Sequence, residues 1–129
     1  MQAFVAVGAG AAVGAWLRWG LGALLNPLFP TIPLGTLAAN LLGGFLMGVA
    51  MAVLNHYEAL APEARLLVTT GFLGGLTTFS TFSAETATLL TRGQLAWSGA
   101  LVALHVAGSV ALTLAGIALA HVALGARVR

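Results

Sequence analysis

The sequence has no cysteine, no lysine and no aspartate, and charged side chains make up only 6% of its 129 residues. Without cysteine, the chain can form neither a disulfide framework nor a thiolate zinc cluster. A water-soluble domain carries about 25% charged residues because its surface faces water. The composition of this chain therefore excludes a water-soluble domain. The net charge of +2 comes from five scattered arginines and three glutamates. This excludes the basic stripe of a nucleic-acid-binding protein.

Long apolar stretches dominate what is present, since 60% of the residues are hydrophobic and the mean hydropathy is +1.02. One transmembrane helix requires about 20 mostly apolar residues. Pro27, Pro30 and Pro33 interrupt the longest uncharged stretch, because proline removes a helical N–H donor. The sequence therefore predicts an all-α integral membrane protein, a single four-helix domain over residues 1–129. The predicted spans are about 3–25, 34–55, 64–91 and 96–124.

The arginines give only a weak preference for one orientation in the membrane. Four spans place Arg65, Arg127 and Arg129 on one side and Arg92 on the other, where Arg18 joins it if its side chain reaches that way. An excess of basic residues in cytoplasmic loops normally sets orientation. Because the arginines are distributed almost evenly between the two sides, the chain can insert in both orientations. We therefore predict a dual-topology, antiparallel homodimer.

Three pairs of glycines occur at the GxxxG spacing, at which small residues let helices approach closely in lipid. The pairs are Gly10/Gly14, Gly44/Gly48 and Gly71/Gly75. Glycine is also common in membrane helices for other reasons, so the spacing predicts a helix contact for at least one pair rather than for all.

The third span contains a poor helix interior. Gly74 and Gly75 are followed closely by Thr77 and Thr78 near its middle, and glycine costs a helix about 1 kcal/mol relative to alanine. Two interpretations stand at this point. A helix broken here would offer free backbone groups that can hold ions, whereas an unbroken helix would use the glycines to accommodate a neighbour.

Polar and aromatic residues at membrane depth are the candidate functional residues, because each buried polar group is costly unless it has a partner. Phe79 and Phe82 lie three residues apart, and the positive edges of their rings suit an anion, although two phenylalanines also pack well in a helical core. The Asn40 amide has two donors, which suit either an anion or a second helix. One helical stripe in the fourth span comprises His105, Ser109 and Thr113.

Two charged residues lie within the predicted spans. Arg18 suits either a vestibule that attracts anions or a side chain that reaches the headgroups. Glu85 suits a proton carrier, a gate or a solvated position near the interface. The sequence contains no HExxH, GxSxG or phosphate-loop motif, and we predict that the protein is not an enzyme.

Three segments of the sequence resemble those of the Fluc (CrcB) family of fluoride channels. They are residues 14–19 (GAWLRW), residues 35–40 (GTLAAN) with Gly43, and residues 71–82 (GFLGGLTTFSTF). The four-span layout and the length are also similar from end to end. The resemblance implies a dual-topology homodimer in the cell inner (plasma) membrane, with two antiparallel fluoride pores at the subunit interface. With its unwound backbone in the third span, it favours the first of the two interpretations, and we predict that the third helix is broken near its middle.

The resemblance also implies roles for individual residues. Asn40 would donate to fluoride, and Phe79 and Phe82 would supply ring edges. A polar track would comprise Ser80, Thr81, His105, Ser109 and Thr113. The backbone carbonyl groups of Gly74 and Thr77, two from each subunit, would hold a structural Na⁺ on the dimer axis. Arg18 would lie at the vestibule of the pore, and Glu85 would lie near a pore mouth.

The function expected from this resemblance is passive fluoride conduction, with export as the physiological direction. An inside-negative potential drives an anion out, by about 2.3 kcal/mol per charge per 100 mV. Two alternatives remain. A dual-topology exporter of organic cations would need a membrane-embedded carboxylate, for which Glu85 is the only candidate. A non-transporting assembly subunit would use the same polar residues only to join helices.

Overall fold

The computed structural model describes residues 1–125, which contain helices and no strand. Three long helices are α1 (Gln2–Leu25), α2 (Leu34–His56) and α6 (Leu95–Ala123). Each of the three is long and apolar enough to cross a membrane. Between α2 and α6 the chain forms a segmented helix, which comprises α3 (Pro62–Leu66), η2 (Leu67–Leu73), α4 (Gly74–Leu76) and α5 (Phe79–Thr91).

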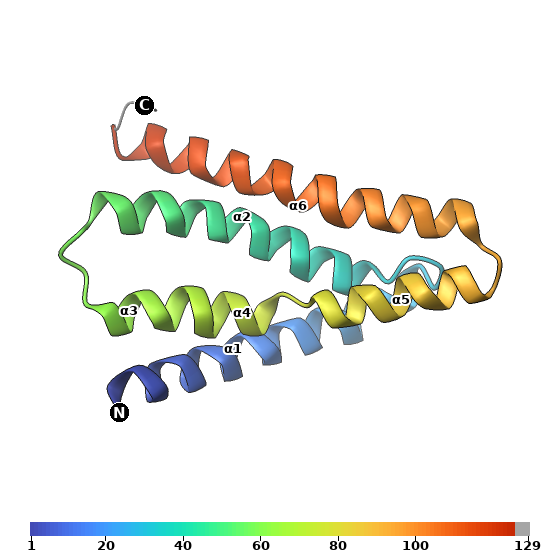
Figure 1. The fold of residues 1–129 in the computed structure, drawn as a ribbon, viewed down its shortest axis with the longest axis horizontal. Coiled ribbons are helices and arrows are strands. Elements are labelled where there is room, and N and C mark those ends of the chain that lie inside the picture. The colour runs from blue at the N-terminus through green and yellow to red at the C-terminus, as the bar shows by residue number, and fades with distance from the viewer. Residues whose placement is uncertain (126–129) are drawn as a thin grey trace.

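The four stretches of helix run side by side along the length of the molecule (Figure 1). The start of α1, the loop between α2 and α3, and the end of α6 lie at one end. The short turn η1 (Asn26–Leu28) and the turn between α5 and α6 lie at the other. Arg65 and Arg92 therefore lie at opposite ends, as predicted, while Arg127 and Arg129 lie outside the described residues.

The break predicted in the third span is confirmed at Thr77 and Thr78. Thr77 has φ −83° and ψ 156°, and Thr78 has φ −151° and ψ 116°, so both residues are extended rather than helical. Two weak helix formers, Gly74 and Gly75, precede the break, and Thr78 caps the helix that follows. The π-helical turn η2, directly before α4, was not predicted.

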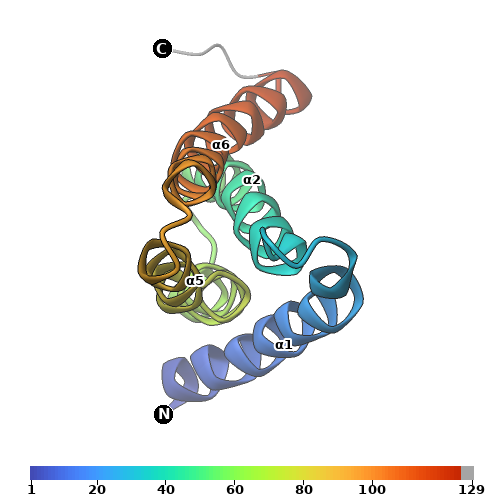
Figure 2. The same cartoon turned by 90° about the vertical axis from the view of Figure 1, so that its right-hand side faces the viewer.

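The segmented helix changes its packing partner at the break. Its first half, from α3 to α4, packs against α1, whereas α5 packs against α6, and the end-on view shows these pairs on different sides of the molecule (Figure 2). The buried residues divide in the same way. Leu73 and Leu76 join a cluster with α2, and Phe82 and Leu89 join another with α6. The break thus joins two separately packed halves.

All three predicted glycine pairs are contacts, but they lie within one subunit. Gly10 and Gly14 of α1 pack on Gly71 and Gly75, and a Cβ atom added to Gly10 would lie 3.1 Å from the Cα atom of Gly71. The third pair, Gly44 and Gly48, packs in the same way on the α6 backbone. The glycine pairs therefore explain the fold of the subunit and give no separate support for a dimer.

Candidate functional site

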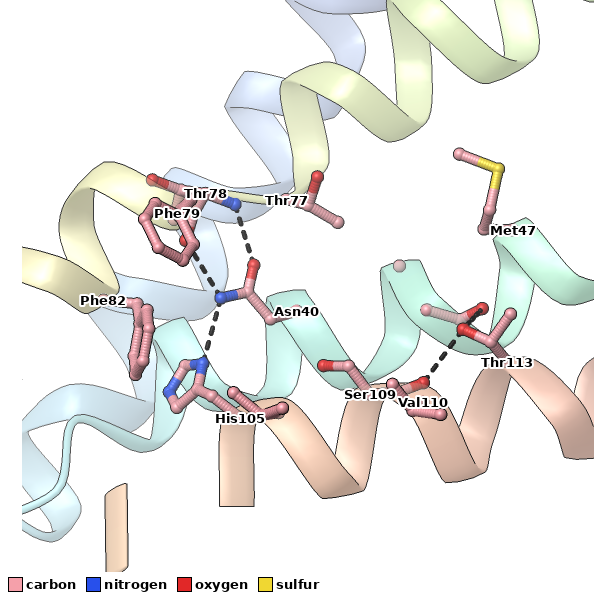
Figure 3. A pocket seen from close by; sticks show the side chains of 13 residues that line it. Asn40, Met47, Thr77, Thr78, Phe79, Phe82, His105, Ser109, Val110 and Thr113 are labelled. Carbon is pink, nitrogen blue, oxygen red and sulfur yellow. Dashed lines mark hydrogen bonds between the residues drawn. The ribbon is translucent and has the colours of Figure 1, made fainter. Parts of the chain in front are cut away.

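Asn40 spans the break in the third span. Its side-chain oxygen accepts a hydrogen bond from the Thr78 N–H at 2.7 Å, and its Nδ2 donates to the Thr78 carbonyl at 3.0 Å (Figure 3). The extended backbone takes Thr78 out of the regular helical pattern. A polar backbone group in an apolar interior needs a partner, and one amide supplies partners to both backbone groups of Thr78.

The same amide reaches the fourth span. Asn40 Nδ2 lies 3.0 Å from Nδ1 of His105, so α2, the break and α6 meet at one side chain. His105 is only 4% exposed, and the Phe82 ring stacks on its imidazole with a centroid separation of 4.6 Å. Both N–H bonds of the Asn40 amide are thus directed at protein acceptors. Donation from Asn40 to an anion stays a prediction.

Thr78 also organises the start of α5. Its hydroxyl oxygen accepts from the Thr81 N–H at 3.1 Å, which is the usual contact of an N-capping threonine. The hydroxyl groups of Ser80 and Thr81 lie 3.2 and 3.0 Å from the same oxygen. The structure therefore gathers Ser80 and Thr81 at the helix cap, and neither lines the cavity described next.

A cavity of about 420 Å³ lies between α2, α5 and α6. It brings together six of the predicted pore residues, which are Asn40, Phe79, Phe82, His105, Ser109 and Thr113 (Figure 3). The predicted stripe on the fourth span is thus confirmed as a shared face. The remaining lining residues include Thr77 and Thr78 and otherwise are small or apolar, and none carries a formal charge with histidine counted as neutral.

The two phenylalanines differ in how far the subunit covers them. Phe79 is 77% exposed and Phe82 only 8%, while their ring centroids lie 5.5 Å apart with an interplanar angle of 62°. In this T-shaped pair, one ring directs its edge at the face of the other. Phe79 is therefore available to a neighbouring molecule, whereas Phe82 is held between α5 and α6.

The hydroxyl of Thr113 is already engaged with the backbone. Its Oγ1 lies 2.9 Å from the Gly44 carbonyl and 2.9 Å from that of Ser109, and it can donate to either. The contact with Gly44 joins α6 to α2 at the point where glycine permits close approach. Ser109 lies one turn closer to the break and faces the cavity (Figure 3).

Arg18 points into the subunit rather than away from it. Its Nε donates to the Gly75 carbonyl at 3.0 Å, close to the break. It also lines a second cavity, of about 370 Å³, together with Thr36, Thr78 and Thr81. A guanidinium group that binds a backbone carbonyl beside a cavity is consistent with the predicted vestibule and less so with a side chain that reaches the headgroups.

Glu85 lines a third cavity, of about 230 Å³, near the end of the molecule that carries Arg92. Thr81 and Thr88 share this cavity, so Glu85 lies on a polar face of α5. The Thr36 hydroxyl donates to Oε1 of Glu85 at 2.6 Å. Its second oxygen, Oε2, is buried and has no hydrogen-bond partner within residues 1–125.

Two carbonyls at the break lose the donors that a continuous helix would give them. The Thr78 N–H, which would reach the Gly74 carbonyl, binds Asn40 instead. The Thr81 N–H, which would reach the Thr77 carbonyl, binds the Thr78 hydroxyl. Gly74 is moreover exposed on the surface of the subunit. Carbonyl oxygens without their regular helical donors are suitable ligands for a hard cation.

Two residues of the site were missed in the sequence. Thr36 lies one helical turn before Asn40 on the same face, and the i, i+4 rule would have linked the two. Thr78 precedes Phe79 at the start of α5, where the preference for threonine at N-caps would have indicated its capping role. Its pairing with Asn40, 38 residues away, left no local signal.

Comparison with known proteins gives the same family over most of the chain. The model of the family described as CrcB-like protein, Camphor Resistance (CrcB), matches residues 5–117. A protein of Nitrosospira multiformis named fluoride-specific ion channel FluC is 62% identical over 117 residues, which cover 91% of each chain. Proteins of the same name from Aromatoleum aromaticum and Pseudomonas putida are 61% and 55% identical. Each of these two alignments covers 92% of this chain. They cover 90% of the Aromatoleum aromaticum protein and 93% of the Pseudomonas putida protein.

The family match includes the break, all residues that line the cavity and most of each apolar helix, rather than one short motif. The relatives are named as ion channels and not as enzymes. The chain is therefore an integral membrane protein that belongs to the CrcB-like protein family.

Proposed function

We propose that this protein is a fluoride-selective channel that conducts the anion passively. The cavity between α2, α5 and α6 carries the proposal, because it gathers aromatic edges, hydroxyl groups and an imidazole without a formal charge. Relatives at 55–62% identity bear the name fluoride-specific ion channel. A site that binds an anion without a fixed positive charge favours release as well as entry, which conduction requires.

Phe79 and Phe82 are the proposed anion-binding aromatics. The edge of a phenyl ring is positive and its face is negative, so an edge attracts an anion without carrying a formal charge. The polar track is proposed to continue along α6 through His105 and Ser109 to Thr113, which share the cavity. Ser80 and Thr81 are proposed to contribute through the capped start of α5.

The functional unit is proposed to be a dual-topology homodimer, with four membrane crossings in each subunit. The segmented helix from Pro62 to Thr91 extends between the same two ends as α2 and α6 and would be the further crossing (Figure 1). Phe79 is 77% exposed beside the cavity, where a second copy would enclose it. Two antiparallel subunits would then form two pores of opposite orientation.

The absence of cysteine makes the orientation directly measurable. Ala61 and Gln94 lie in the loops at opposite ends of the subunit, so each accepts a single cysteine. For dual topology, we expect a membrane-impermeant thiol reagent to label about half of either variant in intact cells and the rest after permeabilisation. Complete labelling of one variant and none of the other would contradict dual topology.

A structural Na⁺ is proposed on the axis of this dimer. The Gly74 and Thr77 carbonyls would hold it, because their regular helical donors are bound elsewhere and Gly74 is exposed on the surface of the subunit. Two such carbonyls from each subunit would give an oxygen site. When bound, the cation would neutralise the carbonyl dipoles at the break and join the two subunits.

Export from the cytoplasm across the inner (plasma) membrane is the proposed direction. The inside-negative potential supplies about 2.3 kcal/mol per charge per 100 mV, so no chemical energy source is required. Arg18, beside the second cavity, would attract the anion into a vestibule, and Glu85, beside the third, would lie near a mouth of the pore.

Replacing Phe79 with isoleucine is expected to lower fluoride flux about fivefold, since an aromatic edge contact is worth about 1 kcal/mol. Purified protein in liposomes loaded with potassium fluoride, with valinomycin to carry potassium, allows efflux to be followed with a fluoride electrode. Phe4→Ile makes the same change at an exposed position outside the cavities and should leave flux unchanged. Equal flux in the wild type and in Phe79→Ile would contradict the role of Phe79.

The same liposomes distinguish the proposal from its alternatives. Fluoride efflux without chloride efflux from the wild type supports a selective channel. Proton-coupled uptake of an organic cation would indicate an exporter that uses Glu85, the only acidic residue within a predicted span. Absence of any flux would favour an assembly subunit.

A further inference from the structure

We propose that His105 presents a neutral Nε2–H donor to the permeating anion, in a tautomer that the Asn40 amide selects. The proposal rests on fluoride conduction and assigns a specific atom to it. It also gives Asn40 a positioning role, because its N–H groups are directed at the Thr78 carbonyl and at His105.

The orientation of the Asn40 amide is determined by the break. The Thr78 N–H can only donate, so the group that faces it at 2.7 Å must be the amide oxygen. The Thr78 carbonyl can only accept, so the group that faces it at 3.0 Å must be the amide nitrogen. The reversed amide would place oxygen against oxygen and N–H against N–H. The two backbone groups of Thr78 thus fix which end of Asn40 is the donor.

The amide orientation in turn determines the tautomer of His105. The second N–H of Asn40 points at Nδ1 of the imidazole, 3.0 Å away, so Nδ1 must be the acceptor and carries no proton. A neutral imidazole whose Nδ1 is unprotonated carries its proton on Nε2. The doubly protonated ring would oppose two N–H groups, and Asn40 could relieve this only by giving up its pairing with Thr78.

The Nε2–H group has no partner within residues 1–125 although the residue is 96% buried, since only 4% of His105 is exposed. A buried donor without an acceptor is costly. Nδ1 faces Asn40, and the second ring nitrogen lies beneath Phe82 on the other side of the imidazole (Figure 3). An acceptor that passes this point would complete the hydrogen bonding of the site.

Phe82 adds a second positive edge at the same place. Its ring lies over the imidazole at 4.6 Å with an interplanar angle of only 28°. A phenyl ring has C–H groups around its whole rim, so one of its edges points in nearly the same direction as the Nε2–H bond. An anion at this rim would meet a hydrogen-bond donor and a C–H edge together, and neither carries a formal charge.

The tautomer can be observed by ¹⁵N NMR of histidine-labelled protein in liposomes, because a protonated ring nitrogen and an unprotonated one have well separated shifts. His56→Gln and His121→Gln assign the signals of the other two histidines. We expect the wild type to carry the His105 proton on Nε2, and fluoride to shift this nitrogen more than Nδ1. In Asn40→Asp, a carboxylate faces Nδ1, so the proton should move to Nδ1.

Flux through two matched variants tests the donor itself. His105→Gln places an amide N–H near the position of Nε2 and should stay within about threefold of the wild type, whereas His105→Phe keeps the aromatic stacking without the donor. Loss of a hydrogen bond to a charged partner corresponds to a fall of about tenfold or more in His105→Phe. Size-exclusion chromatography checks that both variants are folded.

A wild-type proton on Nδ1, or wild-type flux in a folded His105→Phe, would overturn the proposal while leaving fluoride conduction intact. If both variants fail to fold, the tautomer and its response to fluoride decide the question. Wild-type vesicles that pass no fluoride would overturn the proposed function and with it the donor role of His105. The two failures are therefore distinguishable.

Discussion

Replacing Asn40 with alanine is expected to lower fluoride flux by about two orders of magnitude while the dimer persists. The change removes the partners of the Thr78 N–H and carbonyl and of His105 Nδ1. Each unsatisfied buried group costs about 1–3 kcal/mol, so the break loses about 3 kcal/mol of the energy that defines its geometry. The helix contacts between α2 and α6, which are extensive, do not depend on this side chain.

The matched control is Asn55→Ala, which makes the same change at an exposed position near the end of α2. It should retain wild-type flux in the liposome assay and the wild-type elution volume. An Asn40→Ala protein that elutes normally and conducts like the wild type would show that the break keeps its geometry without the amide. That result would remove the structural basis for the role of Asn40.

Replacing Gly48 with alanine is expected to destabilise the subunit by about 2–3 kcal/mol, because added volume in a close-packed contact forces the helices apart. A Cβ atom there would lie 2.9 Å from the Thr113 carbonyl carbon and 3.0 Å from the Ile117 nitrogen, both in the α6 backbone. Backbone atoms of a helix cannot yield as a flexible side chain can. Thermal unfolding in detergent, followed by tryptophan fluorescence, measures the loss.

Gly20→Ala is the control for this prediction, because a Cβ atom added at Gly20 in α1 meets nothing within 4 Å. Alanine is favoured over glycine in a helix by about 1 kcal/mol, so Gly20→Ala should unfold at the wild-type temperature or slightly above it. Equal stability of Gly48→Ala and Gly20→Ala would mean that α2 and α6 can separate without cost.

The features that could be predicted from the sequence depend on local properties. The ends of α1, α2 and α6 lie within two residues of the predicted limits, because apolar length and proline content determine where a membrane helix begins and ends. The break follows from weak helix formers next to a capping threonine. The stripe from His105 to Thr113 follows from helical periodicity.

The features that could not be predicted depend on contacts between distant residues. The partners of Asn40 lie 38 and 65 residues away, and Arg18 binds a carbonyl 57 residues away. From the sequence alone, the Asn40 amide suited an anion and a helix contact equally well. The glycine spacing indicated contacts but not that the pairs at Gly10 and Gly71 meet each other inside one subunit.

The sequence by itself therefore determined that the chain lies in a membrane, where its helices end, where one of them breaks and which polar residues share a face. These properties follow from hydropathy, helix propensity and periodicity, which act over a few residues. Only the tertiary structure decided what the polar groups bind. The backbone N–H and carbonyl of Thr78 orient the Asn40 amide, and that amide orients His105, because hydrogen bonds between packed helices are set by three-dimensional proximity rather than by spacing along the chain.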